Sequence, residues 1–450
     1  MSDLASSTDI AQLAELARAS GRLGIDTEFM GEGRYRTLLC LVQVAVETQD
    51  GVRIDVVDPL DEAIDPTPLA DTIADPSIEI VMHAGRQDVA LLRRVWATNV
   101  TNLFDTQLAA GFAGMRAQLG YEALLHELLG VRLSKSASFT RWDARPLSAE
   151  QIDYARDDVR HLLQATTALQ QRLAARERLD WAREECLAIA AATDERDPDL
   201  IFARLPRVNS LDPKLRAVAR ELVQWREETA RTQDRPIPAV LSDTALIEIA
   251  KRRPSALSQL EQIRGINEPT LRRRGKAILA AVERGRERPP IPVEGDRPAQ
   301  PSALDAPVIA LAEALVRTRA LECELAYELI AARADLQAIV LAMRDGRSPP
   351  DVRTLQGWRR EVVGNELIEL LDGRRSLTVG PDRHVAVAER DVDAAASGCP
   401  FRRSSGSPAT GKISSESSPA ATSAAASTLP IMPSSWPIAV AATMNGSDVA

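Results

Sequence analysis

The sequence predicts a mixed α/β domain, then two all-helical bundles, then a tail without regular structure. Three apolar, strand-like runs at residues 22–29, 37–46 and 51–58 follow a short helix at 8–20. Alternating helical and strand-like segments continue to about residue 190, an order typical of a mixed α/β domain. Beyond residue 205, apolar residues recur only at helical spacing, and after residue 376 this spacing ends.

These changes in pattern divide the chain into five parts. The expected boundaries are 1–195 for the α/β domain, 205–288 for the first bundle, 289–304 for a proline-rich linker, 305–375 for the second bundle and 376–450 for the tail. The tail is rich in serine, alanine and proline, so we expect it to be disordered. The sequence leaves open whether it is an extension particular to this chain or a reading-frame artefact.

Composition indicates an ordinary globular protein. The chain has 450 residues, of which 45% are hydrophobic and 26% charged. Its formal net charge of −9 argues only weakly against nucleic-acid binding, because net charge does not describe the field inside one groove. Four widely spaced cysteines indicate neither a disulfide framework nor a zinc site. Because the N-terminus lacks the features of a signal peptide and no apolar run is long enough to cross a membrane, we expect a cytoplasmic protein.

Two acids stand at the tip of the first predicted strand. Asp26 and Glu28 are two residues apart, so they project to the same side of the strand. Two carboxylates on one face repel each other unless a positive charge lies between them, and a hard divalent cation such as Mg²⁺ suits that place. By itself such a pair is more often a set of solvated surface acids.

Two later stretches add further polar groups. Asp88 stands in the first turn of a helix predicted at 86–96, directly after a strand at 78–82. Tyr154 and Asp158 are one turn apart in a long helical segment predicted from Ser148 to about Leu173, with Ser148 and Gln151 as a capping box. Asp157 shares the face of Tyr154 too, and we expect it to face solvent or a basic neighbour.

The three motifs Asp-x-Glu, His-x-Gly-x-x-Asp and Tyr-x-x-x-Asp, in this order, resemble those of the tyrosine-bearing Asp-Glu-Asp-Asp (DEDDy) 3′–5′ exonucleases. More closely, the chain resembles the ribonuclease D family. Further matching stretches extend over about residues 22–165: Asp26 to Met30, Leu39 to Ala45, Ile54 to Leu60, Phe104 to Gln107 and Trp142 to Leu147. The resemblance implies a ribonuclease-H-like (DnaQ-like) fold with the acids at one edge of the sheet. It also implies that 205–288 is an HRDC (helicase-and-ribonuclease-D C-terminal) domain and 305–375 a second, diverged HRDC-like domain.

The resemblance implies hydrolysis of the last phosphodiester bond at a 3′ end, releasing nucleoside 5′-monophosphates. Two divalent ions, Mg²⁺ or Mn²⁺, would serve this reaction. By resemblance, Asp26 bridges both ions, Glu28 and Asp158 hold the ion on the side of the nucleophile, and Asp88 supports the second. Tyr154 would position the attacking water by a hydrogen bond, since an ordinary tyrosine pKa of about 10 makes it a poor base at neutral pH.

Substrate contacts are predicted less sharply. Phe29 and Met30 could stack against terminal bases, although an ordinary core role is equally open for Phe29. His83 is a candidate near the substrate or a structural histidine. Asp105 is expected to cap a helix. The three basic candidates for phosphate contacts, which could equally be architectural around the Trp142–Leu147 stretch, are Lys135, Arg141 and Arg145.

The first bundle carries a local excess of basic residues. Between residues 251 and 276 there are eight basic residues against two acidic ones, beside a glycine turn that resembles a helix–hairpin–helix motif. The alternative is a solvated basic face. The candidate nucleic-acid contacts are Arg264, Gly265, Arg272, Arg273, Arg274 and Lys276.

Together these features predict a metal-dependent 3′–5′ exoribonuclease that trims structured RNAs such as tRNA precursors, with neither a membrane nor an obligate protein partner. RNA rather than DNA follows from the resemblance alone, because no residue visibly reads a 2′-hydroxyl. A DNA-directed exonuclease is one alternative, and a catalytically silent RNA-binding protein is the other.

Overall fold

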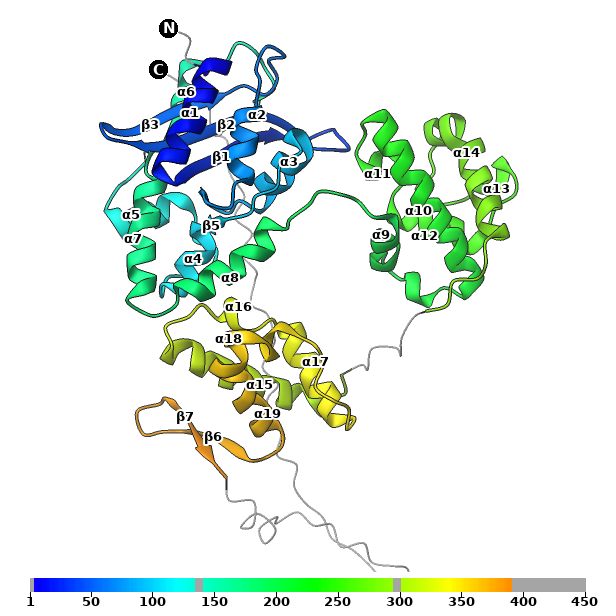
Figure 1. Cartoon of the computed structure of the whole chain (residues 1–450). Coiled ribbons are helices and arrows are strands. Elements are labelled where there is room, and N and C mark those ends of the chain that lie inside the picture. The colour runs from blue at the N-terminus through cyan, green and yellow to red at the C-terminus, as the bar shows by residue number, and fades with distance from the viewer. Residues whose placement is uncertain (1–3, 134–140, 294–300, 391–450) are drawn as a thin grey trace, which may run out of the picture. The chain divides into compact units, whose positions relative to one another are not determined.

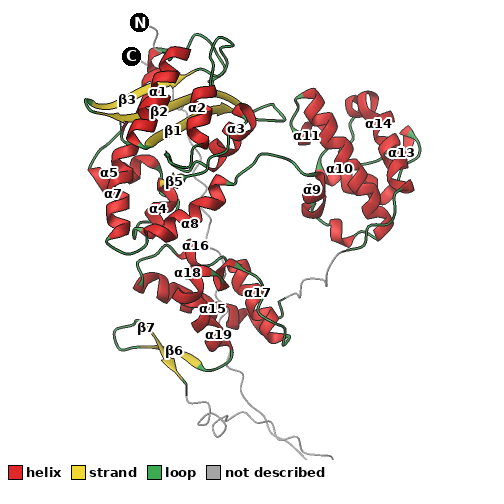
Figure 2. Cartoon of the chain, viewed as in Figure 1, coloured by secondary structure: helices red, strands yellow, loops and turns green. Residues whose placement is uncertain are grey.

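Unbroken apolar runs form the long strands of a five-stranded sheet in the N-terminal domain. The computed structural model describes residues 4–133, 141–293 and 301–390 (Figures 1 and 2). Strand order is β3-β2-β1-β4-β5, with β1, β2 and β3 antiparallel and β4 and β5 parallel to β1. The predicted mixed sheet is therefore confirmed. The strands are β1 (Arg22–Met30), β2 (Leu38–Thr48), β3 (Gly51–Val57), β4 (Glu79–Met82) and β5 (Leu103–Asp105).

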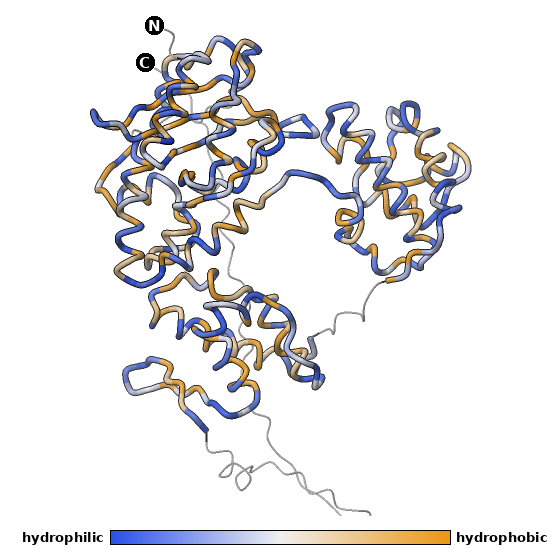
Figure 3. The backbone as a smooth tube through the Cα atoms, viewed as in Figure 1, coloured by the Kyte–Doolittle hydropathy of each residue, from blue (hydrophilic) through white to orange (hydrophobic). Residues whose placement is uncertain are grey.

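Helices cover both faces of this sheet, because the strands bury apolar side chains on both sides. Helices α1 (Ser7–Ser20), α2 (Thr67–Ala74) and α3 (Arg86–Trp96) pack on one face with side chains such as Ile25 and Val44. The other face lies under α6 (Ala149–Arg160) and α7 (Leu162–Ala174). In Figure 3, orange and blue stretches alternate along these elements, as expected where one side of each element is buried. The domain is completed by α4 (Thr106–Phe112), α5 (Tyr121–Leu129) and α8 (Leu179–Ala190).

The helical segment predicted from Ser148 to about Leu173 is interrupted at one residue and therefore forms two helices, α6 and α7. His161 lies between α6 and α7 with φ −110° and ψ 5°, which is not helical. The break lets α7 pack Leu162 and Leu163 against the sheet. The predicted capping box of Ser148 and Gln151 is confirmed at the start of α6.

Two helical groups follow the α/β domain, as predicted. In both, a long helix precedes a four-residue helix and then a helix of 10 or 12 residues. No described helix is both long and apolar enough to cross a lipid bilayer. The first group contains α9 (Pro198–Arg204), η1 (Val208–Ser210), α10 (Pro213–Gln233), α11 (Ile237–Val240), α12 (Asp243–Arg252), α13 (Leu257–Glu261) and α14 (Glu268–Glu287). The second contains α15 (Asp305–Glu322), α16 (Tyr327–Ile330), α17 (Arg333–Arg344), η2 (Arg353–Leu355), α18 (Gly357–Arg359), η3 (Arg360–Gly364) and α19 (Asn365–Leu371).

A β-hairpin follows the second group, where the sequence predicted no regular structure. Strands β6 (Arg375–Val379) and β7 (Val385–Glu389) pair antiparallel. The hairpin is stabilised because Leu377 and Val387, which are opposite each other, pack against the apolar core of the second group. The expected start of the tail at residue 376 is therefore wrong. The expectation of disorder for 391–450 lies outside the described residues.

Candidate active site

Strand β1 places Asp26 and Glu28 on the face covered by α6 and α7. Gly24, two residues before Asp26, faces this side, since a Cβ built on it would lie 3.3 Å from a methyl carbon of Leu163. The alternation of side chains then carries Asp26 and Glu28 to the same side. Opposite them on β2 lie Gln43 and Leu41 respectively. As predicted, the two acids share one face at the end of a buried strand.

The pairing of β1 with β2 is irregular directly after Glu28. Glu28 is opposite Leu41 whereas Phe29 is opposite Leu39, so Cys40 is the extra residue of a β-bulge. Bulges are frequent beside active sites because they bend a strand and change the direction of its side chains.

Asp88 is held by a tightly built turn between β4 and α3. Gly85 has no space for a side chain, because a Cβ there would lie 2.6 Å from the side chain of Met82. The Asp105 carboxylate accepts hydrogen bonds from the backbone N–H groups of Gly85 (2.8 Å) and Ala84 (3.3 Å). It also caps α4 by accepting from the backbone N–H of Leu108, which confirms the predicted N-cap. Asp105 thus fixes the turn that presents Asp88.

The Asp88 carboxylate accepts a hydrogen bond from the hydroxyl of Thr27. Thr27 lies between Asp26 and Glu28 on β1, so its side chain points to the face that α3 covers. Asp88, which is 7% exposed, therefore contacts β1 from the side opposite to the two strand acids.

Helix α6 carries Tyr154 and Asp158 above the strand acids. The two residues are separated by one turn and so share a helix face. The ring of Tyr154 lies 5.9 Å, centroid to centroid, from the ring of Trp142. Asp157 accepts a hydrogen bond of 2.7 Å from Arg160, which agrees with the predicted basic neighbour.

The four acids act electrostatically as one group. Burial, followed by the charges of Asp88, Asp158 and Glu28, raises the pKa of Asp26 well above its usual range. Burial and the charges of Asp158 and Asp88 raise the pKa of Glu28 to about 8. Burial likewise raises the pKa of Asp158 to about 7, and that of Asp88 to about 6 against the hydrogen bond from Thr27. Each acid therefore resists ionisation in the absence of a positive charge.

The same surroundings act on Tyr154. Burial and the charges of Asp158, Glu28 and Asp26 raise the pKa of Tyr154 to about 12. Its hydroxyl therefore keeps its proton at neutral pH and can donate a hydrogen bond.

The donor chemistry of the four acids fits hard divalent cations. Carboxylate oxygens are the preferred ligands of Mg²⁺ and Mn²⁺, and a cation between the acids would remove the repulsion that raises their pKa values. As the side chains lie, however, no three Asp, Glu, His or Cys residues of the described chain are gathered as a ready-made metal site. The Asp88 carboxylate is instead engaged with the hydroxyl of Thr27. The acid side chains would therefore have to rotate to hold a cation, and the attraction between the carboxylates and the cation would favour that rotation.

The predicted substrate residues divide between the site and the framework. Phe29 and Met30 are half-buried at the end of β1, and Met30 packs with the core beside Tyr154. Arg141 is exposed and paired with Asp143 at 3.0 Å. Lys135 lies outside the described residues.

His83 is largely enclosed. One ring nitrogen, Nδ1, lies 2.9 Å from the hydroxyl of Thr106, and the ring lies 5.4 Å from the ring of Tyr121. Burial is the main cause that lowers the pKa of His83. These contacts favour the structural alternative, a neutral histidine that braces the turn before Asp88.

Arg145 serves the framework, which is the architectural alternative that the sequence left open. Its guanidinium makes a two-point ion pair with Asp58, with N–O distances of 2.5 and 2.6 Å. It also donates to the carbonyl oxygens of Trp142 (2.7 Å) and Cys40 (2.9 Å). Since its donors are occupied, Arg145 joins the segment before α6 to strands β2 and β3.

The basic residues of the first helical group also divide. Arg264, Arg272, Arg273 and Lys276 are exposed, and Gly265 has φ +95°, the left-handed conformation that favours glycine in such a turn. Arg274 differs, because it donates to the carbonyl oxygen of Ala239 (2.8 Å) and to the side chain of Gln233 (2.9 Å). It therefore stabilises the bundle, and the prediction that it contacts nucleic acid is not supported by its geometry.

Three residues near the acids were not singled out from the sequence. They are Thr27, which bonds Asp88, Tyr121, which packs on His83, and Gln43, which faces Asp26 across the strands. Of these three, Gln43 alone could have been noticed in the sequence. Apart from Cys40, every other residue from Leu38 to Val46 is apolar, so a polar glutamine stands out there.

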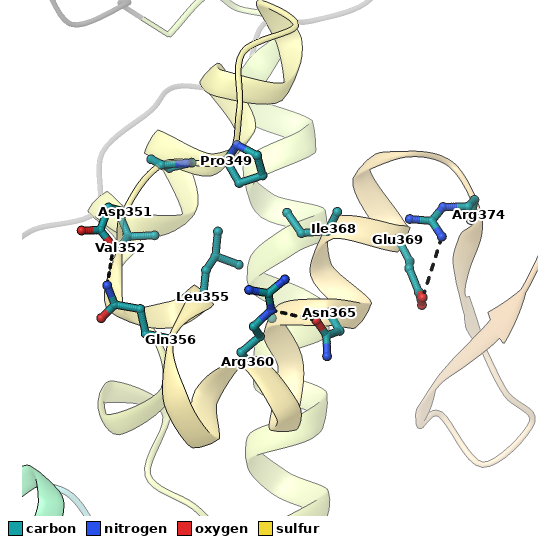
Figure 4. Close-up of a pocket in the computed structure, with 12 residues that line it drawn as sticks. Pro349, Asp351, Val352, Leu355, Gln356, Arg360, Asn365, Ile368, Glu369 and Arg374 are labelled. Carbon is teal, nitrogen blue, oxygen red and sulfur yellow. Dashed lines mark hydrogen bonds and ion pairs between the residues drawn. The ribbon is translucent and has the colours of Figure 1, made fainter.

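A separate polar pocket of about 790 Å³ lies in the second helical group, between residues 349–356 and α19 (Figure 4). Two of its basic side chains are already paired within it, Arg360 with Asn365 and Arg374 with Glu369. None of the acids described above lines it. Although this pocket is large, it is therefore not the site that the four acids form.

Comparison with known proteins agrees with the fold. A family model described as 3′–5′ exonuclease matches residues 4–174, and an HRDC domain model matches residues 216–282. The mixed sheet, with acids contributed by β1, α3 and α6, therefore belongs to a 3′–5′ exonuclease domain, the catalytic part of a hydrolase.

Relatives that match most of the chain show which family of 3′–5′ exonucleases it belongs to. The chain is 35% identical to ribonuclease D of Gluconacetobacter diazotrophicus over 382 residues, which cover 83% of this chain and 94% of that protein. It is 33% identical to ribonuclease D of Granulibacter bethesdensis over 381 residues, covering 83% and 93%. The crystal structure of Escherichia coli RNase D superposes with a TM-score of 0.71 at 29% identity, covering 82% of this chain and 98% of that one. The chain belongs to the ribonuclease D family.

Proposed function

We propose that this protein is a metal-dependent 3′–5′ exoribonuclease that releases nucleoside 5′-monophosphates from the 3′ ends of structured RNAs, tRNA precursors among them. The observation that carries the proposal is the group of four acids, Asp26, Glu28, Asp88 and Asp158, each with a raised pKa. Enclosed carboxylates whose pKa values are raised by burial, and for Asp26 and Glu28 also by the neighbouring acids, suit a site completed by cations. The E. coli neighbour is described as an exoribonuclease involved in structured RNA processing, which supports RNA as the substrate.

In this proposal, the four acids hold two divalent ions, Mg²⁺ or Mn²⁺. When bound, such ions supply a hydroxide nucleophile near neutral pH and stabilise charge on the attacked phosphate and on the leaving 3′ oxygen. We assign Asp26 to both ions, because the charges of all three other acids raise its pKa. Glu28 and Asp158 would bind on the side of Tyr154, and Asp88 on the other side.

Tyr154 positions the attacking water. Because its pKa is raised to about 12, its hydroxyl stays protonated and acts as a hydrogen-bond partner rather than a base. Phe29 and Met30, which are half-buried and follow Glu28 on β1, would contact the terminal nucleotide. The exposed basic residues of the HRDC domain (Arg264, Arg272, Arg273 and Lys276) would contact phosphates farther along the RNA.

The proposal is tested with an Asp26→Asn variant on a 3′-tailed RNA and a DNA of matching sequence. The wild-type protein should release 5′-monophosphates stepwise from RNA in Mg²⁺ or Mn²⁺ and lose this activity in EDTA. Asp26→Asn should lose cleavage by about 10³-fold or more, because it removes a charge that holds the cation, while RNA binding measured in EDTA stays within about twofold of wild type. Asp61→Asn, at an exposed acid in the loop after β3, is the matched control and should cleave normally.

The other outcomes separate the alternatives. Equal cleavage of DNA would identify a general exonuclease. RNA binding without cleavage in either metal would identify a catalytically silent RNA-binding protein. Wild-type cleavage by Asp26→Asn would refute the assignment of the acids.

A further inference from the structure

One buried polar side chain beside the acids has no evident role in the fold. Gln43 lies in the middle of β2 and is 0% exposed. Its side-chain Oε1 and Nε2 atoms are both buried and have no hydrogen-bond partner among the described residues. Its neighbours along the strand, from Leu41 to Val46, are apolar and fully buried. A buried amide without partners destabilises a fold, so an apolar residue of similar size would serve the core better.

The strand register shows what this amide faces. Gln43 is directly opposite Asp26 on β1 and Val56 on β3. Directly opposed residues of antiparallel strands point to the same face, with Cβ atoms about 5 Å apart. Asp26 is therefore the polar side chain in direct cross-strand contact range of Gln43.

The helix above the sheet makes no hydrogen bond to the amide in the described chain. The fully buried side chains of α6 on this face, Ile152, Ala155 and Val159, are apolar, and the half-buried Tyr154 packs beside them. The amide therefore lies between α6 and the carboxylate of Asp26, with two N–H donors and one acceptor to satisfy.

We propose that Gln43 is the positioning residue of Asp26, donating a side-chain N–H to the Asp26 carboxylate when that carboxylate holds a divalent cation. The inference rests on the proposed function, which assigns Asp26 to the cations. A carboxylate ligand leaves lone pairs for further hydrogen bonds, and a donor from the protein fixes the direction in which it presents its oxygens. The amide suits this place because it supplies a donor without a charge that would compete with the cation.

This role explains why a polar group is retained in an apolar layer. With the cation bound, the amide gains a strong, charge-assisted acceptor. Without the cation, the amide has no hydrogen-bond partner among the described residues and contributes nothing to stability. Gln43 therefore favours the cation-bound state over the cation-free state.

The test uses the full chain and Mn²⁺ alone, with no RNA. Mn²⁺ affinity is measured by electron paramagnetic resonance of the free ion, and thermal stability is measured separately in EDTA. Gln43→Met keeps the length of the side chain but removes the amide. The expected result is a Kd for Mn²⁺ raised about tenfold or more, as for other residues that support metal ligands, with a Tm in EDTA equal to or above that of wild type.

Leu41→Met is the matched control. Leu41 is on the same strand and face, opposite Glu28, and changes shape without changing polarity. Its Mn²⁺ affinity should equal that of wild type. Equal weakening by Leu41→Met and Gln43→Met would show a packing effect and overturn the inference.

Two further outcomes would also overturn it. If Gln43→Met binds Mn²⁺ as wild type does, the amide does not support Asp26. If Gln43→Met lowers the Tm in EDTA markedly, the amide has a structural partner and its role is in folding. A wild-type protein that binds no Mn²⁺ would instead refute the proposed function itself, so the two failures are distinguishable.

Discussion

Replacing Glu28 by glutamine should stabilise the cation-free protein at alkaline pH. Glu28 is mostly buried, and its pKa is raised from 4.5 to about 8 by burial and by the charges of Asp158 and Asp88. At about 1.4 kcal/mol for each pKa unit, ionised Glu28 costs the folded state at most about 5 kcal/mol at pH 9. Because neighbouring acids share protons and the structure relaxes around a charge, we expect about 1–2 kcal/mol to be recovered in the variant.

The direction of the pH dependence follows from the raised pKa. Between about pH 4.5 and 8 the folded chain holds a proton on Glu28 that the unfolded chain has lost. Stability of the wild-type protein in EDTA therefore falls as the pH rises through this window. In Glu28→Gln this fall in stability is smaller. The free energies of unfolding of the two proteins in EDTA should therefore differ most at pH 9 and by only a few tenths of a kcal/mol at pH 5.

The assay is thermal unfolding at pH 5 and pH 9, in EDTA and in excess Mn²⁺. At pH 9 in EDTA, Glu28→Gln should unfold about 3–6 °C above wild type. In Mn²⁺ the order should reverse, because wild type gains the binding free energy of the cation and the variant has lost a ligand. Glu47→Gln, at an exposed position of β2, is the control and should leave both curves unchanged.

The reasoning would be refuted if Glu28→Gln in EDTA at pH 9 were no more stable than wild type. That result would mean that the acids are solvated well enough to ionise at no cost. An equal gain in the stability of Glu28→Gln at pH 5 would also contradict the reasoning, because at that pH Glu28 is already protonated in the folded wild-type protein.

Two other substitutions test the roles of single side chains. Tyr154→Phe should lower kcat on a 3′-tailed RNA roughly 10²-fold with little change in KM, because the hydroxyl that positions the water is lost. Its pH–rate profile between pH 6 and 9 should keep the wild-type shape, since the pKa of Tyr154 is raised to about 12; a lost alkaline limb would identify Tyr154 as a base. Arg145→Lys should lower the free energy of unfolding in urea by about 2–3 kcal/mol, because lysine cannot reproduce the two-point pair with Asp58. RNA affinity in EDTA should be unchanged, and a weakened affinity at wild-type stability would restore a phosphate contact for Arg145.

The sequence determined the parts of this protein that depend on local pattern. Apolar runs indicated the strands, and period-two alternation placed Asp26 and Glu28 on one face. Helical spacing put Tyr154 and Asp158 on one side of α6. Capping patterns indicated the starts of α4 and α6, at Asp105 and Ser148. Each of these features depends on residues within about one turn or one strand of each other.

Tertiary structure decided the features that depend on distant partners. The helical segment is interrupted at His161, after which α7 packs on the sheet, and the hairpin at 375–389 is stabilised by packing against the second helical group. Arg145 is a framework residue because it pairs with Asp58. The two residues are 87 positions apart along the chain, so only the fold shows that they lie within hydrogen-bond distance. For the same reason the roles of Thr27 toward Asp88 and of Gln43 toward Asp26 emerge only from the fold. A side chain's spacing along the sequence determines which face it occupies, but only tertiary packing determines which group it meets there.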